Sequence, residues 1–222
     1  MTTTLLEKQE ARRPEAAQTE TGPALYHWTV DALYRALDAG VFEHPERLEL
    51  IQGRIIENMS QDPLHRSMRV RIARRLRAAL MPQLVVIEEC PVHIAFDGEL
   101  TPDVVALRGA EADYDERHPE GQDVAILVEV SNTTTAYDLS GKANQYARSG
   151  VPDYWVVLVN EAAIVRHRQP TPDGYAEVVQ LAGADMVSPL AAPDAVWTVD
   201  ALLGREEESA AQTDEQNGGV LG

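Results

Sequence analysis

Residues 124–159 read VAILVEVSNTTTAYDLSGKANQYARSGVPDYWVVLV, and this stretch decides the fold class. It opens with the nearly continuous apolar run 124–131, which is typical of a strand buried on both faces. A helix is predicted over about 137–149, because a glycine and a proline that terminate helices follow it. The apolar run 153–159 predicts another strand. Strand, helix and strand in succession predict an α/β or mixed α+β sandwich, in which a mixed β-sheet is flanked by helices.

The flanking sequence supplies further elements of both kinds. Thr29 is a good N-cap and Gly40 a good terminator, so a helix is predicted between them. The segment 48–58, LELIQGRIIEN, predicts a β-hairpin that turns at Gln52-Gly53. Residues 64–80 carry apolar side chains at four-residue spacing and predict a long helix. Further strands are expected at 84–89, 92–96, 103–107, 162–168 and 175–180, and a short helix at 199–203.

The composition is that of one ordinary globular domain. The chain has 222 residues, of which 44% are hydrophobic and 25% charged. We expect the domain to span 23–204, between polar, disordered tails at 1–22 and 205–222. The single cysteine excludes an internal disulfide framework and fits a reducing compartment. Without a signal peptide or an apolar run of about 20 residues, the chain is expected to be soluble and cytoplasmic.

The net charge of -17 argues against a general nucleic-acid-binding surface, and the predicted tails carry only 5 of these charges. Helix 64–80 is the exception, because it contains six arginines. We predict that the arginines on its outward side form a strip that contacts phosphates. The alternative is that they form a solvated face that pairs with acids. The arginines are Arg66, Arg69, Arg71, Arg74, Arg75 and Arg77, and we take Arg66, Arg69, Arg74 and Arg77 as the nucleic-acid-binding candidates.

Two acidic residues are candidates for a metal site. Glu129 lies inside the apolar run AILVEV, where an unpaired carboxylate would be costly to bury, so that a metal ion or a partner should offset its charge. Asp103 follows the rigid Pro102 at the start of a strand. Together on neighbouring strands they would form half of a Mg²⁺ site. The alternatives are a structural ion pair or a sheet-edge position for Glu129 and a plain turn for Asp103.

Two basic side chains complete the candidates. Lys142 lies on the helix that follows the strand of Glu129, four residues after Asp138. Directed at the carboxylates, its ammonium would stabilise charge that develops on a phosphate, whereas the alternative is a solvated surface pair. His65 opens helix 64–80, where it could approach a phosphate or orient a carboxylate. Its alternative is a polar residue of the first helical turn.

Three segments resemble the Uma2 family, also called DUF820, a family of predicted restriction endonucleases in the PD-(D/E)XK nuclease superfamily. They are TPDVVAL, RLELIQGRIIENMS and ILVEVSNTTTAYDLSGKANQYARSGVPDYWVVLVN, and the similarity covers roughly 24–204. The resemblance implies a restriction-endonuclease-like fold with a mixed sheet flanked by helices. It implies that Asp103 and Glu129 take the acidic motif roles, and that the backbone carbonyl of Val130 completes the metal site.

The chain departs from the superfamily pattern at the lysine. The motif places lysine two residues after Glu129, where this chain has Ser131. Lys142 resembles the position to which the lysine migrates in this family. Glu49 matches the ELIxG pattern and is a possible further acid near the metal, with a surface strand residue as its alternative. A histidine at the position of His65 is also part of the resemblance.

These observations predict a metal-dependent endonuclease that hydrolyses phosphodiester bonds, most simply in DNA, with Mg²⁺ or Mn²⁺ as cofactor. One rival is a catalytically silent nuclease fold that acts as a DNA-binding or protein-interaction module. Another is a nuclease that acts on RNA or on a particular nucleic-acid structure. Analogy with the superfamily suggests a homodimer. The histidines lack zinc-ligand spacing, so no zinc is expected, and no P-loop, GxSxG or GxGxxG motif is present.

Overall fold

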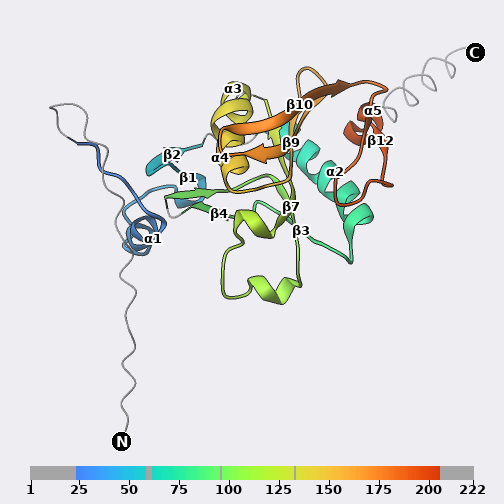
Figure 1. The fold of residues 1–222 in the computed structure, drawn as a ribbon. Coiled ribbons are helices and arrows are strands. Elements are labelled where there is room, and N and C mark those ends of the chain that lie inside the picture. The colour runs from blue at the N-terminus through green and yellow to red at the C-terminus, as the bar shows by residue number, and fades with distance from the viewer. Residues whose placement is uncertain (1–23, 59–61, 96, 133, 206–222) are drawn as a thin grey trace, which may run out of the picture.

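A computed structural model describes residues 24–58, 62–95, 97–132 and 134–205 (Figure 1). The expected tail at 1–22 lies outside these residues, as does all of the expected C-terminal tail except Arg205. Among the described residues, no helix combines the length and the apolar character that crossing a membrane requires.

A six-stranded mixed sheet forms the centre of the described chain, as the sequence predicts. The strands β7 (Val124–Ser131) and β8 (Asp153–Leu158) run parallel, and the other neighbouring pairs run antiparallel. The parallel pair is the strand–helix–strand unit that residues 124–159 predict, since a parallel connection needs a crossover segment. In spatial order the strands are β10 (Gly174–Ala182), β9 (Ala163–Thr171), β8 (Asp153–Leu158), β7 (Val124–Ser131), β6 (Val104–Leu107) and β3 (Val85–Glu88).

Helices cover both faces of this sheet. The long helix α2 (Pro63–Leu80) packs Met68, Ile72 and Leu76 on one face, together with the short helix α5 (Val199–Leu203). The crossover between β7 and β8 packs on the other face. Both faces of β7 are covered, so every residue of this strand is buried: Ile126, Val128 and Val130 pack on the side of α2, and Val124 and Leu127 on the side of the crossover. A two-stranded sheet of β11 (Met186–Val187) and β12 (Trp197–Thr198) precedes α5.

A second, four-stranded sheet lies beside the central one, with α1 (Val30–Asp38) packed against it (Figure 1). Its hairpin turns at Gln52 and Gly53, both with positive φ, as the sequence predicts. The Thr29 side chain caps α1 by accepting a hydrogen bond from the Ala32 amide at 3.2 Å. The strands are, in order, β2 (Arg54–Glu57), β1 (Leu48–Ile51), β5 (Gly98–Leu100) and β4 (Val92–Ala95).

Several parts of the architecture differ from the sequence prediction. The segment expected to be one helix over 137–149 is three consecutive pieces, namely α3 (Thr135–Tyr137), the π-helical turn η4 (Asp138–Lys142) and α4 (Ala143–Arg148). Strand β5 was not predicted, because a three-residue strand is too short to show an alternating pattern. The 3₁₀ turns were also not predicted, and they are η1 (Pro45–Arg47), η2 (Glu111–Tyr114) and η3 (Gly121–Asp123).

Candidate active site

One pocket collects all five side chains that the sequence singles out for chemistry. It lies where the small sheet, the start of α2, the ends of β6 and β7, and the η4 turn meet. Asp62, Asn132, Thr134, Tyr137 and Asp138 share its wall. The predicted residues that line it are Glu49, His65, Asp103, Glu129 and Lys142, together with Val130.

Asp103 and Glu129 lie on the same face of the central sheet. The β6–β7 ladder ends with Val104 opposite Val128, so the next residues along, Asp103 and Glu129, face one another beyond it. Asp103 Oδ2 accepts a hydrogen bond from the Val130 amide at 2.7 Å, which ties its carboxylate to β7. Both carboxylates are buried. Two carboxylates can share a divalent ion only if they lie on the same face of the sheet, and Asp103 and Glu129 meet this condition.

Lys142 reaches the same place from the crossover. Its Nζ atom donates hydrogen bonds to Glu49 Oε1 at 3.0 Å and to Glu129 Oε1 at 3.1 Å. Lys142 and Asp138 are both buried, at 6% and 3% exposure, so the alternative of a solvated surface pair is wrong. The π-helical turn carries both residues, and such widened turns are frequent at functional sites.

Glu49 is a member of the pocket and not a surface strand residue, because it is only 2% exposed. Its Oε1 atom accepts hydrogen bonds from Lys142 and from the Thr101 amide. Its Oε2 atom is buried and has no hydrogen-bond partner among the described residues. A buried carboxylate oxygen without a partner is costly, so this atom marks a place where a cation would fit.

The pocket contains more buried acid than base. Glu49, Asp103, Glu129 and Asp138 are buried carboxyl groups, whereas Lys142 is the buried amine beside them. Burial raises the pKa of Glu129 well above its usual range, and the neighbouring acids add to this rise while Lys142 opposes it. Burial also raises the pKa of Asp138, against the opposing effect of Lys142. A divalent cation would offset the excess negative charge.

Lys142 stays protonated in this setting. Burial alone lowers the pKa of its ammonium, but the charges of Glu129, Glu49 and Asp138 outweigh burial and raise it above its ordinary value. Tyr146, one turn further along, donates its hydroxyl hydrogen bond to Glu129 Oε1 at 2.9 Å. Two donors from the crossover, Lys142 and Tyr146, therefore hold Glu129 by the same oxygen, Oε1.

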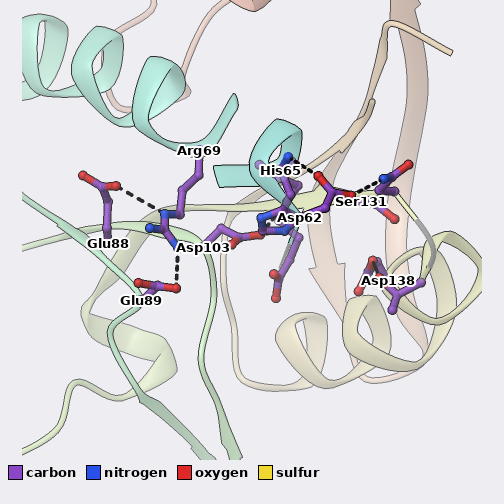
Figure 2. A network of polar contacts seen from close by, with 12 residues as sticks. Asp62, His65, Arg69, Glu88, Glu89, Asp103, Ser131 and Asp138 are labelled. Atoms are coloured by element: carbon purple, nitrogen blue, oxygen red, sulfur yellow. Dashed lines mark hydrogen bonds and ion pairs between the residues drawn. The ribbon is translucent and has the colours of Figure 1, made fainter. Parts of the chain in front are cut away.

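His65 and Asp62 come from the start of α2 (Figure 2). The His65 Nε2 atom lies 3.2 Å from Asp103 Oδ2, so the histidine contacts a carboxylate and is not merely a polar residue of the first turn. Burial lowers the pKa of His65, but the hydrogen bond to Asp103 and its charge outweigh burial and raise it. Asp62 caps α2 by accepting from the His65 amide, and its other oxygen accepts from Asn132. These hydrogen bonds, that of His65 first, lower the pKa of Asp62.

Sequence reasoning missed Tyr146, Asp62 and Asn132. Tyr146 occurs four residues after Lys142, a spacing that places both on one helix face, but an aromatic residue there also suits the core. Asp62 before Pro63 is a recognisable N-cap signal, although nothing in the sequence shows that its second oxygen faces Asn132.

The arginines of α2 do not form one exposed strip. Arg69 is buried, with Nε 3.3 Å from Glu88 Oε2 and an ion pair to Glu89, as Figure 2 shows. Its placement on the outward face was wrong, because two acids beside β3 draw it inward. Arg77 pairs with Glu88 at 2.9 Å. Arg66 and Arg74 are the candidates that remain fully on the exposed side.

The mixed sheet, its helical layers and the acid–lysine pocket define a protein with a nuclease fold. The family model Uma2, described as "Putative restriction endonuclease", matches residues 31–204. The chain therefore belongs to the Uma2 family, as its sequence resemblance indicates, and this membership places it among nucleases.

A solved structure has the same fold. It is described as a "putative nuclease belonging to DUF820" from Anabaena variabilis ATCC 29413, and its TM-score to this chain is 0.61 at 14% sequence identity. The match covers 79% of this chain and 97% of that chain. No match was found among curated proteins.

Proposed function

We propose that the chain is a metal-dependent endonuclease that hydrolyses phosphodiester bonds in DNA. The observation that carries this proposal is the pocket in which Asp103, Glu129 and Glu49 are all buried, with the ammonium of Lys142 bound to the last two. Such an excess of buried carboxylates is costly in a protein that holds them only for structure. It is useful in a protein that binds a divalent cation beside a phosphate.

The donor set fits Mg²⁺ or Mn²⁺. Asp103, Glu129 and the backbone carbonyl of Val130 would hold the ion. The Oε2 atom of Glu49, which no described residue contacts by a hydrogen bond, offers a further oxygen. These are all oxygen donors, which hard divalent cations prefer. When bound, the ion supplies Lewis acidity toward the scissile phosphate.

Lys142 supplies the positive charge that the usual motif position lacks. Ser131 stands at that position, and its hydroxyl donates to Thr135 Oγ1 at 3.0 Å. Lys142 instead enters from η4 and brings its Nζ atom to 3.1 Å from Glu129 Oε1. A protonated amine fixed by two acids stabilises negative charge that develops on the phosphate without having to reorganise. His65 positions Asp103 through the contact to its Oδ2 atom.

The substrate would approach along α2. Arg66 and Arg74 are exposed on this helix, whose N-terminus carries Asp62 and His65 at the pocket. Exposed arginines contact phosphates and set the salt dependence of binding, without reading sequence. A homodimer belongs to the proposal by analogy, because cleavage of both strands of a duplex needs two sites.

A second candidate is a catalytically silent nuclease fold that acts as a DNA-binding or protein-interaction module. The net charge of -17 favours it, as does the pairing of Arg69 and Arg77 with acids. Both features weaken the attraction of the surface for a polyanion.

The test is cleavage of plasmid DNA, linear duplexes and RNA with Mg²⁺, Mn²⁺ or EDTA. The proposal expects cleavage of DNA that needs the metal, is lost in Asp103→Asn and persists in Asp194→Asn, whose carboxylate is exposed. A calorimetric Mn²⁺ titration of the same variants accompanies it. Mn²⁺ binding with no cleavage of any substrate would support the silent module. Cleavage of RNA alone would replace DNA as the substrate.

A further inference from the structure

A second polar cluster lies away from the pocket and consists of His93, Glu99 and His118. Each residue offers one ligand atom, and these atoms lie within 4.8 Å of one another. His93 comes from β4, Glu99 from β5, and His118 from the connection between η2 and η3. This cluster, here the two-histidine cluster, plays no part in the proposed nuclease site.

Backbone pairing builds the two-histidine cluster. His93 and Glu99 are directly opposite one another in the β4–β5 ladder, so their side chains share a face. The His93 amide donates to the Pro119 carbonyl at 2.8 Å, and His93 forms a bridge with Glu120. These contacts hold His118 beside the cross-strand pair.

Helix α1 also contributes a side chain to the two-histidine cluster. The Tyr34 hydroxyl of α1 donates to Glu99 Oε2 at 2.9 Å and lies 2.8 Å from His118 Nε2. Tyr34 thereby holds two of the three candidate ligands side by side.

The cluster is separated from the nuclease pocket by the small sheet. Leu50 of β1 is paired with Glu99, so Glu99 shares the face of Leu50, which packs under α1. Glu49 precedes Leu50 and points to the opposite face, where it contacts Lys142. An ion in one site would therefore leave the ligands of the other untouched.

One nitrogen of the cluster is not satisfied by the protein. His93 Nε2 is buried and lies 2.7 Å from Glu99 Oε2, yet it has no hydrogen bond of acceptable geometry among the described residues. An imidazole nitrogen and a carboxylate oxygen this close, with a second imidazole beside them, form a donor set that suits zinc more than magnesium. The alternative is a polar cluster held together by Tyr34 alone.

We propose that His93, Glu99 and His118 form a zinc site that is independent of the nuclease pocket. Two nitrogen ligands and one oxygen ligand leave a fourth position of a tetrahedral ion for a small ligand. The ion would fasten the connection between β6 and β7, which carries His118, to the small sheet and α1. Sequence spacing did not reveal the site, because the ligands meet through strand pairing and not through a local motif.

The test uses the untagged full chain with Asp103→Asn and Glu129→Gln, so that the nuclease pocket does not contribute to metal binding. Zinc is titrated by calorimetry, and Co²⁺ is added to record the absorption of a low-symmetry site. We expect one equivalent of zinc to bind and excess Mg²⁺ to leave it bound. His93→Ala and His118→Ala should each weaken zinc binding by about 100-fold or more. Removing a residue that only hydrogen-bonds to a metal ligand costs about 10–100-fold, and removing the ligand itself should cost at least as much.

The matched control is His44→Ala, which removes an exposed histidine and should leave zinc affinity unchanged. Circular dichroism without metal, and the milder His118→Gln, show whether lost binding reflects lost folding. Absence of stoichiometric zinc binding would overturn the proposal. So would equal affinity in the parent, His93→Ala and His118→Ala chains. Neither outcome bears on DNA cleavage, so this proposal and the nuclease proposal fail separately.

Discussion

The acid–lysine pocket and the outer side of α2 both carry many charges, but the pocket buries its charges whereas α2 exposes them. In the pocket, Glu49, Glu129 and Lys142 are buried and joined at 3.0 and 3.1 Å. On the outer side of α2, Arg66 and Arg74 are exposed to solvent. Burial strengthens the coupling between charges and removes salt screening, whereas exposure weakens both. The comparison predicts large effects of mutation in the pocket and small, salt-dependent effects on α2.

The largest effect is expected for Lys142→Ala. Removing the cation leaves Glu49 and Glu129 buried without their shared partner, which should cost about 3–5 kcal/mol of unfolding free energy. Turnover should fall by roughly 10²–10³-fold, the scale for loss of one transition-state donor. Lys142→Arg should recover little, because a planar guanidinium does not replace a compact ammonium. Urea denaturation and single-turnover cleavage measure the two quantities.

The control is the double variant Lys142→Ala/Glu129→Gln, which removes one of the two stranded charges. It should be more stable than Lys142→Ala alone, whereas additive destabilisation would show that the two residues are not energetically coupled. Full cleavage activity in Lys142→Ala would place the catalytic cation elsewhere.

A smaller loss is expected for Tyr146→Phe. The hydroxyl donates to Glu129 Oε1, and both groups are buried. Losing one hydrogen bond to a charged group should cost about 1.5–3 kcal/mol, less than losing Lys142, since the ammonium still contacts the same oxygen. Thermal or urea unfolding checks this, with Tyr26→Phe at an exposed position as control. Equal stability of Tyr146→Phe and the parent chain would deny the hydroxyl a role in holding Glu129.

The contact of His65 with Asp103 predicts a pH dependence. The pKa of His65 is raised from its ordinary 6.5 in the folded state, so the folded protein binds this proton more tightly than the unfolded chain. The stabilisation is complete below pH 6.5 and is lost as the pH rises through the raised value. The unfolding free energy is measured against pH in EDTA, and His65→Gln should not show this decrease. If the curves of the parent chain and the variant ran parallel, the contact would have no effect on stability. His44→Gln, at an exposed position, is the control.

Much of the pocket could be predicted from the sequence because its parts are local. Glu129 stands out as a charged residue within an apolar strand. Asp103 stands out as an acid that follows a rigid proline at the start of another apolar strand. The contact of Glu49 with Lys142 joins residues 93 positions apart, and no local pattern encodes it. The family resemblance suggested only that Glu49 is a further acid near the metal, and it did not predict the contact with Lys142. The π-helical turn that directs Lys142 inward was also missed, because a widened turn has the composition of an ordinary helix.

The prediction of one exposed arginine strip on α2 was wrong for a different reason. Helical periodicity shows which residues share a side of the helix. It does not show that β3, which ends at Glu88 and is followed by Glu89, packs against that helix. Arg69 therefore looks the same in sequence as Arg66, although one is buried in ion pairs and the other is exposed. The two-histidine cluster was hidden in the same way, since strand register and not spacing unites it.

The smallest effect on stability, and the sharpest test of the comparison, is expected for Arg66→Ala/Arg74→Ala. Both side chains are exposed, so each change should alter the unfolding free energy by no more than about 0.5 kcal/mol. If they bind phosphates, the double variant should bind DNA more weakly for all sequences alike. The slope of log affinity against log salt should become shallower by about 2, roughly one unit for each arginine removed from a phosphate. Arg35→Ala, an exposed arginine on α1, should leave the slope unchanged. Binding is measured at several salt concentrations with Asp103→Asn to prevent cleavage. An unchanged slope in the double variant would make these arginines a solvated helix face, and would place the DNA path over another surface of the pocket.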